Sequence, residues 1–159
     1  MEVVTMKSKE LAPSEVRKLI CDQHRDIERR IAEIELLMQG PDRPIEKTVG
    51  AMHEFTQYFL SHVDQEERIL LPVLKDIDAW GDVRVDRMKA EHVEQRAQVK
   101  SLLARLKTEP SNEVKADIRA FFASLRKDIE LEEAEHVHPD VMKDDPVTVK
   151  NFIGCTTEF

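Results

Sequence analysis

The chain has little cysteine, no excess of basic charge and no long apolar run. Its two cysteines, Cys21 and Cys155, lie far apart without a CxxC motif, which excludes a disulfide framework and suits a reducing compartment. The formal net charge of −8 argues against a nucleic-acid surface and against attachment to an anionic membrane. No segment is apolar enough for a signal peptide or a membrane span. We therefore expect a cytoplasmic protein without nucleic-acid or membrane partners.

Glycine is also scarce, with four residues among 159, whereas Leu, Glu, Arg, Lys, Ala and Ile are abundant. This composition favours helix throughout, and the length suits one domain with a full core. We expect a flexible leader over residues 1–12, a helical domain over residues 13–142, and a short C-terminal tail over residues 143–159.

Proline and glycine residues that start or end helices divide the domain into four long amphipathic helices. The first is expected to begin at Pro13 and to end before Gly40, and the second to begin within residues 42–45. Pro72 should kink or stop the second helix. Residues 73–80 then form a short extra turn closed by Gly81, and the third helix starts at Asp82 or Asp86.

The fourth helix follows Pro110, with Ser111 or Asn112 as its cap, and ends near Pro139. Four amphipathic helices joined by short connections predict an all-α, antiparallel up-and-down four-helix bundle. The chain also looks like a duplicated helical hairpin, because HVDQEERILLP from His62 resembles DIELEEAEHVHP from Asp128, including a Glu-Glu doublet at the same offset.

His62 and Glu66 are one helical turn apart, so both project from the face that carries Phe55, Phe59 and Ile69. A histidine and a carboxylate in an apolar stripe are costly to bury without a partner. A metal ion would satisfy both, and a single buried His–Glu hydrogen bond is the alternative. The duplication favours the metal, because each hairpin places a lone histidine opposite a residue pair spaced four apart.

The pattern formed by His24, His62, Glu66-Glu67, Pro72, His92 and Glu132-Glu133 resembles the hemerythrin-like, or HHE cation-binding, family over roughly residues 14–141. The resemblance implies a bundle around a non-haem di-iron centre with an oxo or hydroxo bridge, in which carboxylates of the second and fourth helices bridge the metals. The expected ligands are His24, His62, Glu66, His92, Asp128 and Glu132. Iron is the expected metal, with manganese or zinc as weaker alternatives. Glu67 and Glu133, the second members of the doublets, are expected at the surface.

Two positions depart from the family pattern. Asp128 stands where the resemblance predicts a histidine, and His136, one turn after Glu132, is an alternative ligand. Arg96 stands where oxygen-carrying hemerythrins have a second histidine. A set of three histidines and three carboxylates is rich in oxygen donors, so the site should react with oxygen or peroxide more readily than carry oxygen.

The expected function is that of a hemerythrin-like protein that binds or reacts with O2, peroxide, NO or another small anion, or senses iron or redox state. One alternative is an iron storage or donation protein for the repair of iron centres. Another is a metal-free helical interaction module. No catalytic triad or nucleotide motif is present, so enzymatic activity would rest on a reactive di-iron centre. A homodimer through an exposed bundle face is compatible with the sequence.

Overall fold

The computed structural model describes residues 11–40 and 44–144, and every regular element within these ranges is helical. The prediction of an all-α protein is therefore confirmed. The helices are α1 (Pro13–Leu37), α2 (Ile45–Gln65), the π-helical turn η1 (Glu66–Leu70), α3 (Leu71–Ile77), α4 (Gly81–Thr108) and α5 (Asn112–Glu135). Most of the predicted leader and tail, residues 1–10 and 145–159, lies outside the described residues. Among the described helices, none is long and apolar enough to cross a membrane.

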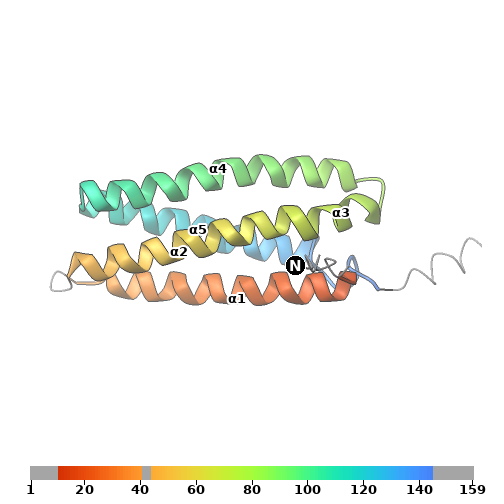
Figure 1. Ribbon diagram of the computed structural model, residues 1–159, viewed down its shortest axis with the longest axis horizontal. Helices are drawn as coiled ribbons and strands as arrows, with labels where there is room; N and C mark the ends of the chain where they lie inside the picture. Colours follow the sequence, from red (N-terminus) through yellow and green to blue (C-terminus); the bar gives the residue numbers. More distant parts are fainter. Residues whose placement is uncertain (1–10, 41–43, 145–159) are drawn as a thin grey trace, which may run out of the picture.

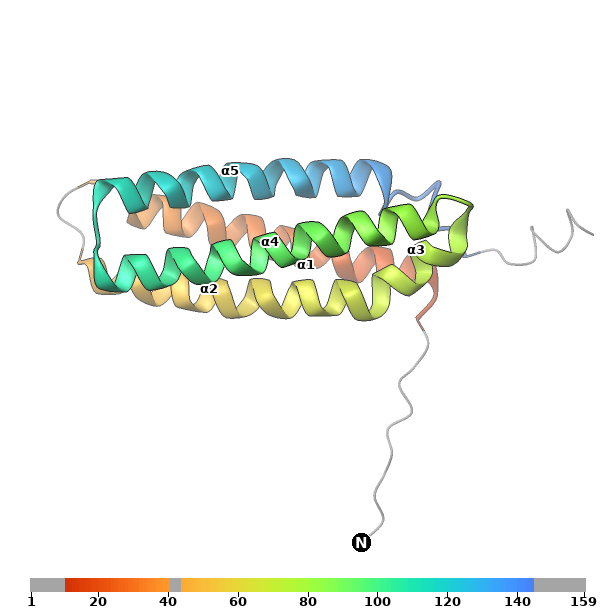
Figure 2. The ribbon, with the colours of Figure 1, turned by 90° about the horizontal axis from the view of Figure 1, so that it is seen from above.

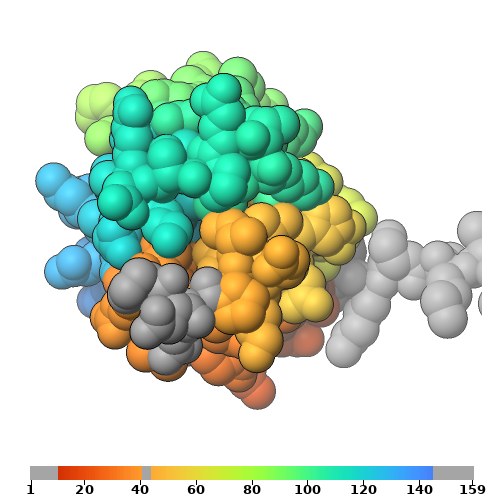
Figure 3. Space-filling view, turned by 90° about the vertical axis from the view of Figure 1, so that its left-hand side faces the viewer, coloured from red at the N-terminus to blue at the C-terminus, as the bar shows by residue number. Residues whose placement is uncertain are grey.

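The four long helices, α1, α2, α4 and α5, lie side by side and form a helical bundle (Figures 1 and 2). Contacts join α1 to α2, α2 to α4, α4 to α5 and α5 back to α1, so the four helices enclose one interior. The short helix α3 continues from α2 at one end. Figure 3 shows the opposite end, where the teal atoms around the α4–α5 connection lie against the orange atoms of α2.

Helix ends follow the local chemistry of the sequence. Pro13 is the first residue of α1, where its missing N–H has no helical partner to lose. Gly40, after the end of α1, has a φ of +87°, a conformation that L side chains rarely adopt. The side chain of Ser111 caps α5 by accepting a 3.2 Å hydrogen bond from the backbone N–H of Val114. The predicted limits of the first helix and the cap of the last one are confirmed.

The passage from α2 to α4 differs from the prediction. The α-helical pattern changes at Glu66, six residues ahead of Pro72, and the wider η1 turn leads into α3, where Pro72 occupies the first turn. Gly81 begins α4 rather than closing the preceding turn. A Cβ atom at Gly81 would lie only 2.2 Å from the carbonyl oxygen of Lys75, so a close backbone approach requires glycine here.

The interior contains two apolar clusters with a polar layer between them. The larger cluster includes Ile27, Val63 and Ile129, and the smaller one includes Ile20 and Leu70. On α1, His24 lies between Ile20 and Ile27. Glu66 lies between Val63 and Leu70, and Glu132 follows Ile129 on α5. The segment after α5 closes the smaller cluster with two buried side chains, Val137 and Met142.

Candidate metal centre

The polar layer is built from side chains that each helix contributes at the same depth of the bundle. His24, His62, Glu66 and His92 are at most 5% exposed, and they come from α1, α2, η1 and α4. Glu132, from α5, is 15% exposed. The helical stripes therefore converge on one point, as the duplicated pattern predicted.

Glu66 is the centre of this layer, because three histidines approach its two oxygens. Its Oε1 atom lies 2.7 Å from Nε2 of His62 and 3.3 Å from Nε2 of His24. Its Oε2 atom lies 2.9 Å from Nε2 of His92. His24, His62 and Glu66 each offer a ligand atom within 4.8 Å of the other two, which is close enough for one cation to replace their mutual contacts.

Glu132 brings a second carboxylate into the same layer without a strong partner. Its Oε1 atom is buried and has no hydrogen-bond partner among the described residues, while Nε2 of His24 lies 3.5 Å away. A buried carboxylate oxygen without a partner is costly. A cation beside it would remove that cost.

The charges of these groups are strongly linked. Burial would lower the pKa of His24, but the nearby carboxyls of Glu132 and Glu66 raise it to about 10. Burial would raise the pKa of Glu66, but His62 and the other two histidines hold it well below its ordinary value. Burial and the charge of Glu66 raise the pKa of Glu132 well above its ordinary value. The raised pKa of His24 and the lowered pKa of Glu66 favour an imidazolium–carboxylate pair in the metal-free layer. A cation that binds Nε2 of His24 would displace the proton from that nitrogen.

All six predicted ligands line one cavity of about 30 Å³, which also borders Phe59 and Leu125 (lining His24, His62, Glu66, His92, Asp128 and Glu132). Such a volume is on the order of one water molecule. Apolar walls of this kind keep solvent away from a metal and strengthen its electrostatic interactions. The role of the six residues as metal ligands stays a prediction that the geometry supports.

Asp128 is the least integrated of the six. It borders the cavity, but its Oδ2 atom accepts a 3.1 Å hydrogen bond from the amide of Gln95, and burial raises its pKa. The alternative ligand, His136, lies just past the end of α5 as its C-cap and borders a neighbouring cavity together with Glu132. Its Nδ1 atom is buried and unpartnered among the described residues. The structure brings Asp128, and not His136, into the central cavity.

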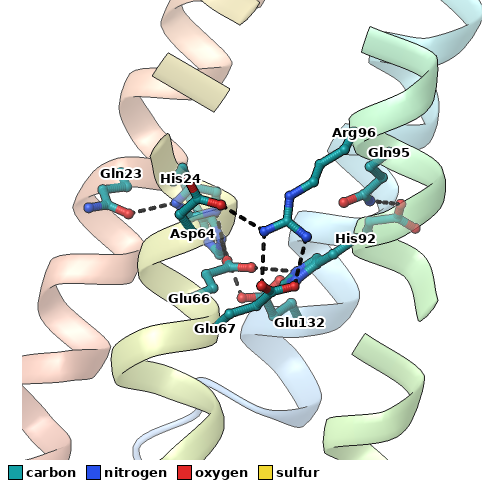
Figure 4. Close-up of polar contacts among 11 residues, drawn as sticks. Gln23, His24, Asp64, Glu66, Glu67, His92, Gln95, Arg96 and Glu132 are labelled. Carbon is teal, nitrogen blue, oxygen red and sulfur yellow. Dashed lines mark hydrogen bonds and ion pairs between the residues drawn. The ribbon is translucent and has the colours of Figure 1, made fainter. Parts of the chain in front are cut away.

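The expectation that Glu67 and Glu133 are ordinary surface residues was wrong. Glu67 lies 3.2 Å from Nδ1 of His92, and Glu133 lies 3.2 Å from Nδ1 of His24. Each is bonded to an arginine as well. Arg96 bonds Glu67 (Figure 4), and Arg25 bonds Glu133. The Glu-Glu doublets were the signal for this arrangement, but which neighbouring helix the second carboxylate would meet requires the three-dimensional structure.

Gln23 was also missed by the sequence reasoning. Its Oε1 atom accepts a 2.6 Å hydrogen bond from Nδ1 of His62, and its amide group donates to Gln65. Every histidine of the layer thus presents Nε2 to the cavity and bonds Nδ1 to a residue outside it. This is the arrangement in which metal-binding histidines are usually found.

In a comparison with known families, the model of the hemerythrin HHE cation binding domain matches residues 16–139. The match covers most of the chain. This protein belongs to the hemerythrin HHE cation-binding domain family. The family resemblance expected from the histidine and glutamate pattern is confirmed, and the His/carboxylate layer lies within the matched residues. Searches of curated proteins and of solved structures gave no match.

Proposed function

We propose that this HHE domain is a non-haem di-iron protein that binds or reacts with O2, peroxide or NO, or senses iron or redox state. We further infer that its helices form the antiparallel up-and-down arrangement expected of a duplicated hairpin. The observation that carries the proposal is the buried carboxylate of Glu66, which three imidazole nitrogens approach at 2.7–3.3 Å, next to the unpartnered oxygen of Glu132.

The donor set fits iron. It consists of imidazole nitrogens and carboxylate oxygens, and the free thiol of Cys21 does not line the cavity. Imidazole and carboxylate suit iron and manganese, whereas structural zinc sites favour thiolates. His24, His62 and Glu66 would hold one metal position, and His92 with Asp128 the other, with Glu66 and Glu132 between them.

Bound iron would supply a redox-active centre that interacts with a small oxidant or anion. The chain itself would orient the three histidines through their Nδ1 partners and limit water to a cavity of about 30 Å³. With three carboxylates and three histidines, the site supports oxidation of ferrous iron more than reversible oxygen carriage. The protein would then act by reacting with its small partner or by responding to it.

The test is an anaerobic loading with ferrous iron followed by exposure to air, monitored by absorption spectroscopy. We expect a charge-transfer band near the ultraviolet edge of the visible spectrum, changed by azide, that does not disappear when oxygen is removed. Oxygen bound and fully released over repeated cycles would contradict the reactive site and indicate a carrier. No band in a protein that contains iron would contradict the di-iron centre.

A metal-free interaction module is the second candidate, because the histidines already satisfy both oxygens of Glu66 without a metal. That candidate predicts no loss of stability when a chelator is added to the purified protein. A metal that binds only the native state must stabilise it, so a lower melting temperature after chelation would exclude the module.

A further inference from the structure

Two of the three histidines in the polar layer have a carboxylate within hydrogen-bond distance of Nδ1, the ring nitrogen that faces away from the cavity. Nδ1 of His92 lies 3.2 Å from Oε1 of Glu67, and Nδ1 of His24 lies 3.2 Å from Oε1 of Glu133. Each carboxylate directly follows an inward-facing glutamate in the sequence, Glu66 or Glu132. Both pairs join the two halves of the duplicated chain, since the first links α4 to η1 and the second links α1 to α5.

An arginine holds each of these carboxylates from the outside. Arg96 bonds both oxygens of Glu67, with one 2.9 Å contact from each terminal nitrogen, and adds a 2.7 Å bond to Asp64 (Figure 4). Arg25 bonds Glu133 and, at 2.8 Å, Glu28. Arg96 is 24% exposed and Arg25 is 55% exposed. A half-buried arginine that bonds a carboxylate in a bidentate manner fixes it more firmly than an exposed arginine does. The Arg96–Glu67 pair is therefore more rigid than the Arg25–Glu133 pair.

A carboxylate bonded to Nδ1 determines how the histidine ring can serve a metal. It keeps the proton on Nδ1, leaves Nε2 as the nitrogen that faces the cavity, and fixes the plane of the ring. His62 lacks this support, because its Nδ1 donates to the neutral amide oxygen of Gln23. His24 and His92 therefore differ from His62, because their Nδ1 atoms contact a carboxylate and that of His62 contacts a neutral amide.

We infer that Glu67 with Arg96, and Glu133 with Arg25, are positioning units that fix the ring orientation and the metal-facing nitrogen of His92 and His24. This also gives Arg96 a role at a position where oxygen-carrying relatives would have a metal-binding histidine. The inference rests on the proposed function in that the rings are positioned for a cation. The orientation itself exists in the metal-free protein and is measured there.

The experiment replaces Glu67 or Glu133 by Ala and by Gln, with Glu94→Ala as the matched control. Glu94 is an exposed glutamate on α4 whose hydrogen bond, 3.4 Å long, comes from Gln98. The first measurement is long-range 1H–15N NMR of the histidine rings in the metal-free protein. We expect Glu67→Ala to abolish the hydrogen-bonded Nδ1–H signal of His92 alone, and Glu133→Ala that of His24 alone.

The second measurement is the affinity for Co²⁺, added as the metal alone. We expect a loss of about 10- to 100-fold for either alanine variant, a partial recovery with glutamine, whose amide oxygen still accepts from Nδ1–H, and no change in Glu94→Ala. Arg96→Lys should fall between wild type and Glu67→Ala, since lysine cannot bond both oxygens.

The outcomes separate this inference from the proposed function. Alanine variants that are less stable but keep their ring signals would overturn the positioning role. So would wild-type Co²⁺ affinity in both alanine variants. A wild-type protein that binds no metal would overturn the proposed function, while the ring signals of the metal-free protein would still decide the positioning role.

Discussion

Replacing Glu66 by Gln would remove the negative charge to which three histidine side chains are bonded. Glu66 is 2% exposed, and the histidine nitrogens lie 2.7, 2.9 and 3.3 Å from its oxygens. Removing one partner of a buried ion pair typically costs about 3–5 kcal/mol. Because Glu132 lies 3.5 Å from His24 and can ionise when Glu66 is neutral, we expect the lower end, about 3 kcal/mol.

The direction of the change in stability follows from the pKa of Glu66, which is held well below its ordinary value of 4.5. A lowered carboxyl pKa contributes stability that is present above the ordinary value and is lost as the pH falls through the lowered one. At pH 7 the contribution is therefore fully present, and the variant should lose it.

The assay is thermal unfolding of the metal-free protein at pH 7, supported by denaturant unfolding. A loss of about 3 kcal/mol corresponds to a melting temperature lower by about 6–12 °C for a chain of this size. Glu94→Gln, at an exposed site on α4, serves as the control and should change the free energy of unfolding by at most about 0.5 kcal/mol. A Glu66→Gln variant as stable as the wild type would refute the reasoning.

Three further predictions concern the scaffold and the thiol. Ser111→Ala removes the cap hydrogen bond to Val114 and should cost about 1 kcal/mol in denaturant unfolding; an unchanged midpoint would mean that the cap contributes nothing. Leu106→Ala empties a fully buried position of the larger cluster and should cost about 2–5 kcal/mol, whereas a loss below about 1 kcal/mol would indicate a loosely packed end. Burial and the charge of Glu133 raise the pKa of Cys21 to about 11. Peptide mapping after iodoacetamide treatment at pH 7.5 should therefore find Cys21 unmodified in the native protein and modified in urea, and rapid native labelling would contradict the raised pKa.

The helices were predictable because their signals are local. Pro13 and Ser111 mark helix starts through their own backbone and side-chain chemistry, and the apolar stripes repeat with helical period. The inward position of His24, Glu66 and His92 followed from the same stripes. The duplicated hairpin added the expectation that six polar groups point into one core, and the six residues line one cavity of the structure.

The features that were missed depend on contacts between distant segments. The η1 turn at Glu66 has no periodic signature in five residues. The sequence predicts that Gly81 closes a turn, yet it begins α4 where the carbonyl of Lys75 leaves no room for a side chain. Glu67 has the spacing of a surface carboxylate on its own helix, and only the packing of α4 brings His92 within reach. Likewise, Gln95 meets Asp128 across a helix interface.

The most direct test of the proposed di-iron centre is the iron content per chain after expression in iron-replete medium, measured by elemental analysis. We predict about two iron atoms per chain. About one would contradict the second position at His92 and Asp128 and leave the position at His24, His62 and Glu66. None, after anaerobic reconstitution, would contradict the iron centre altogether.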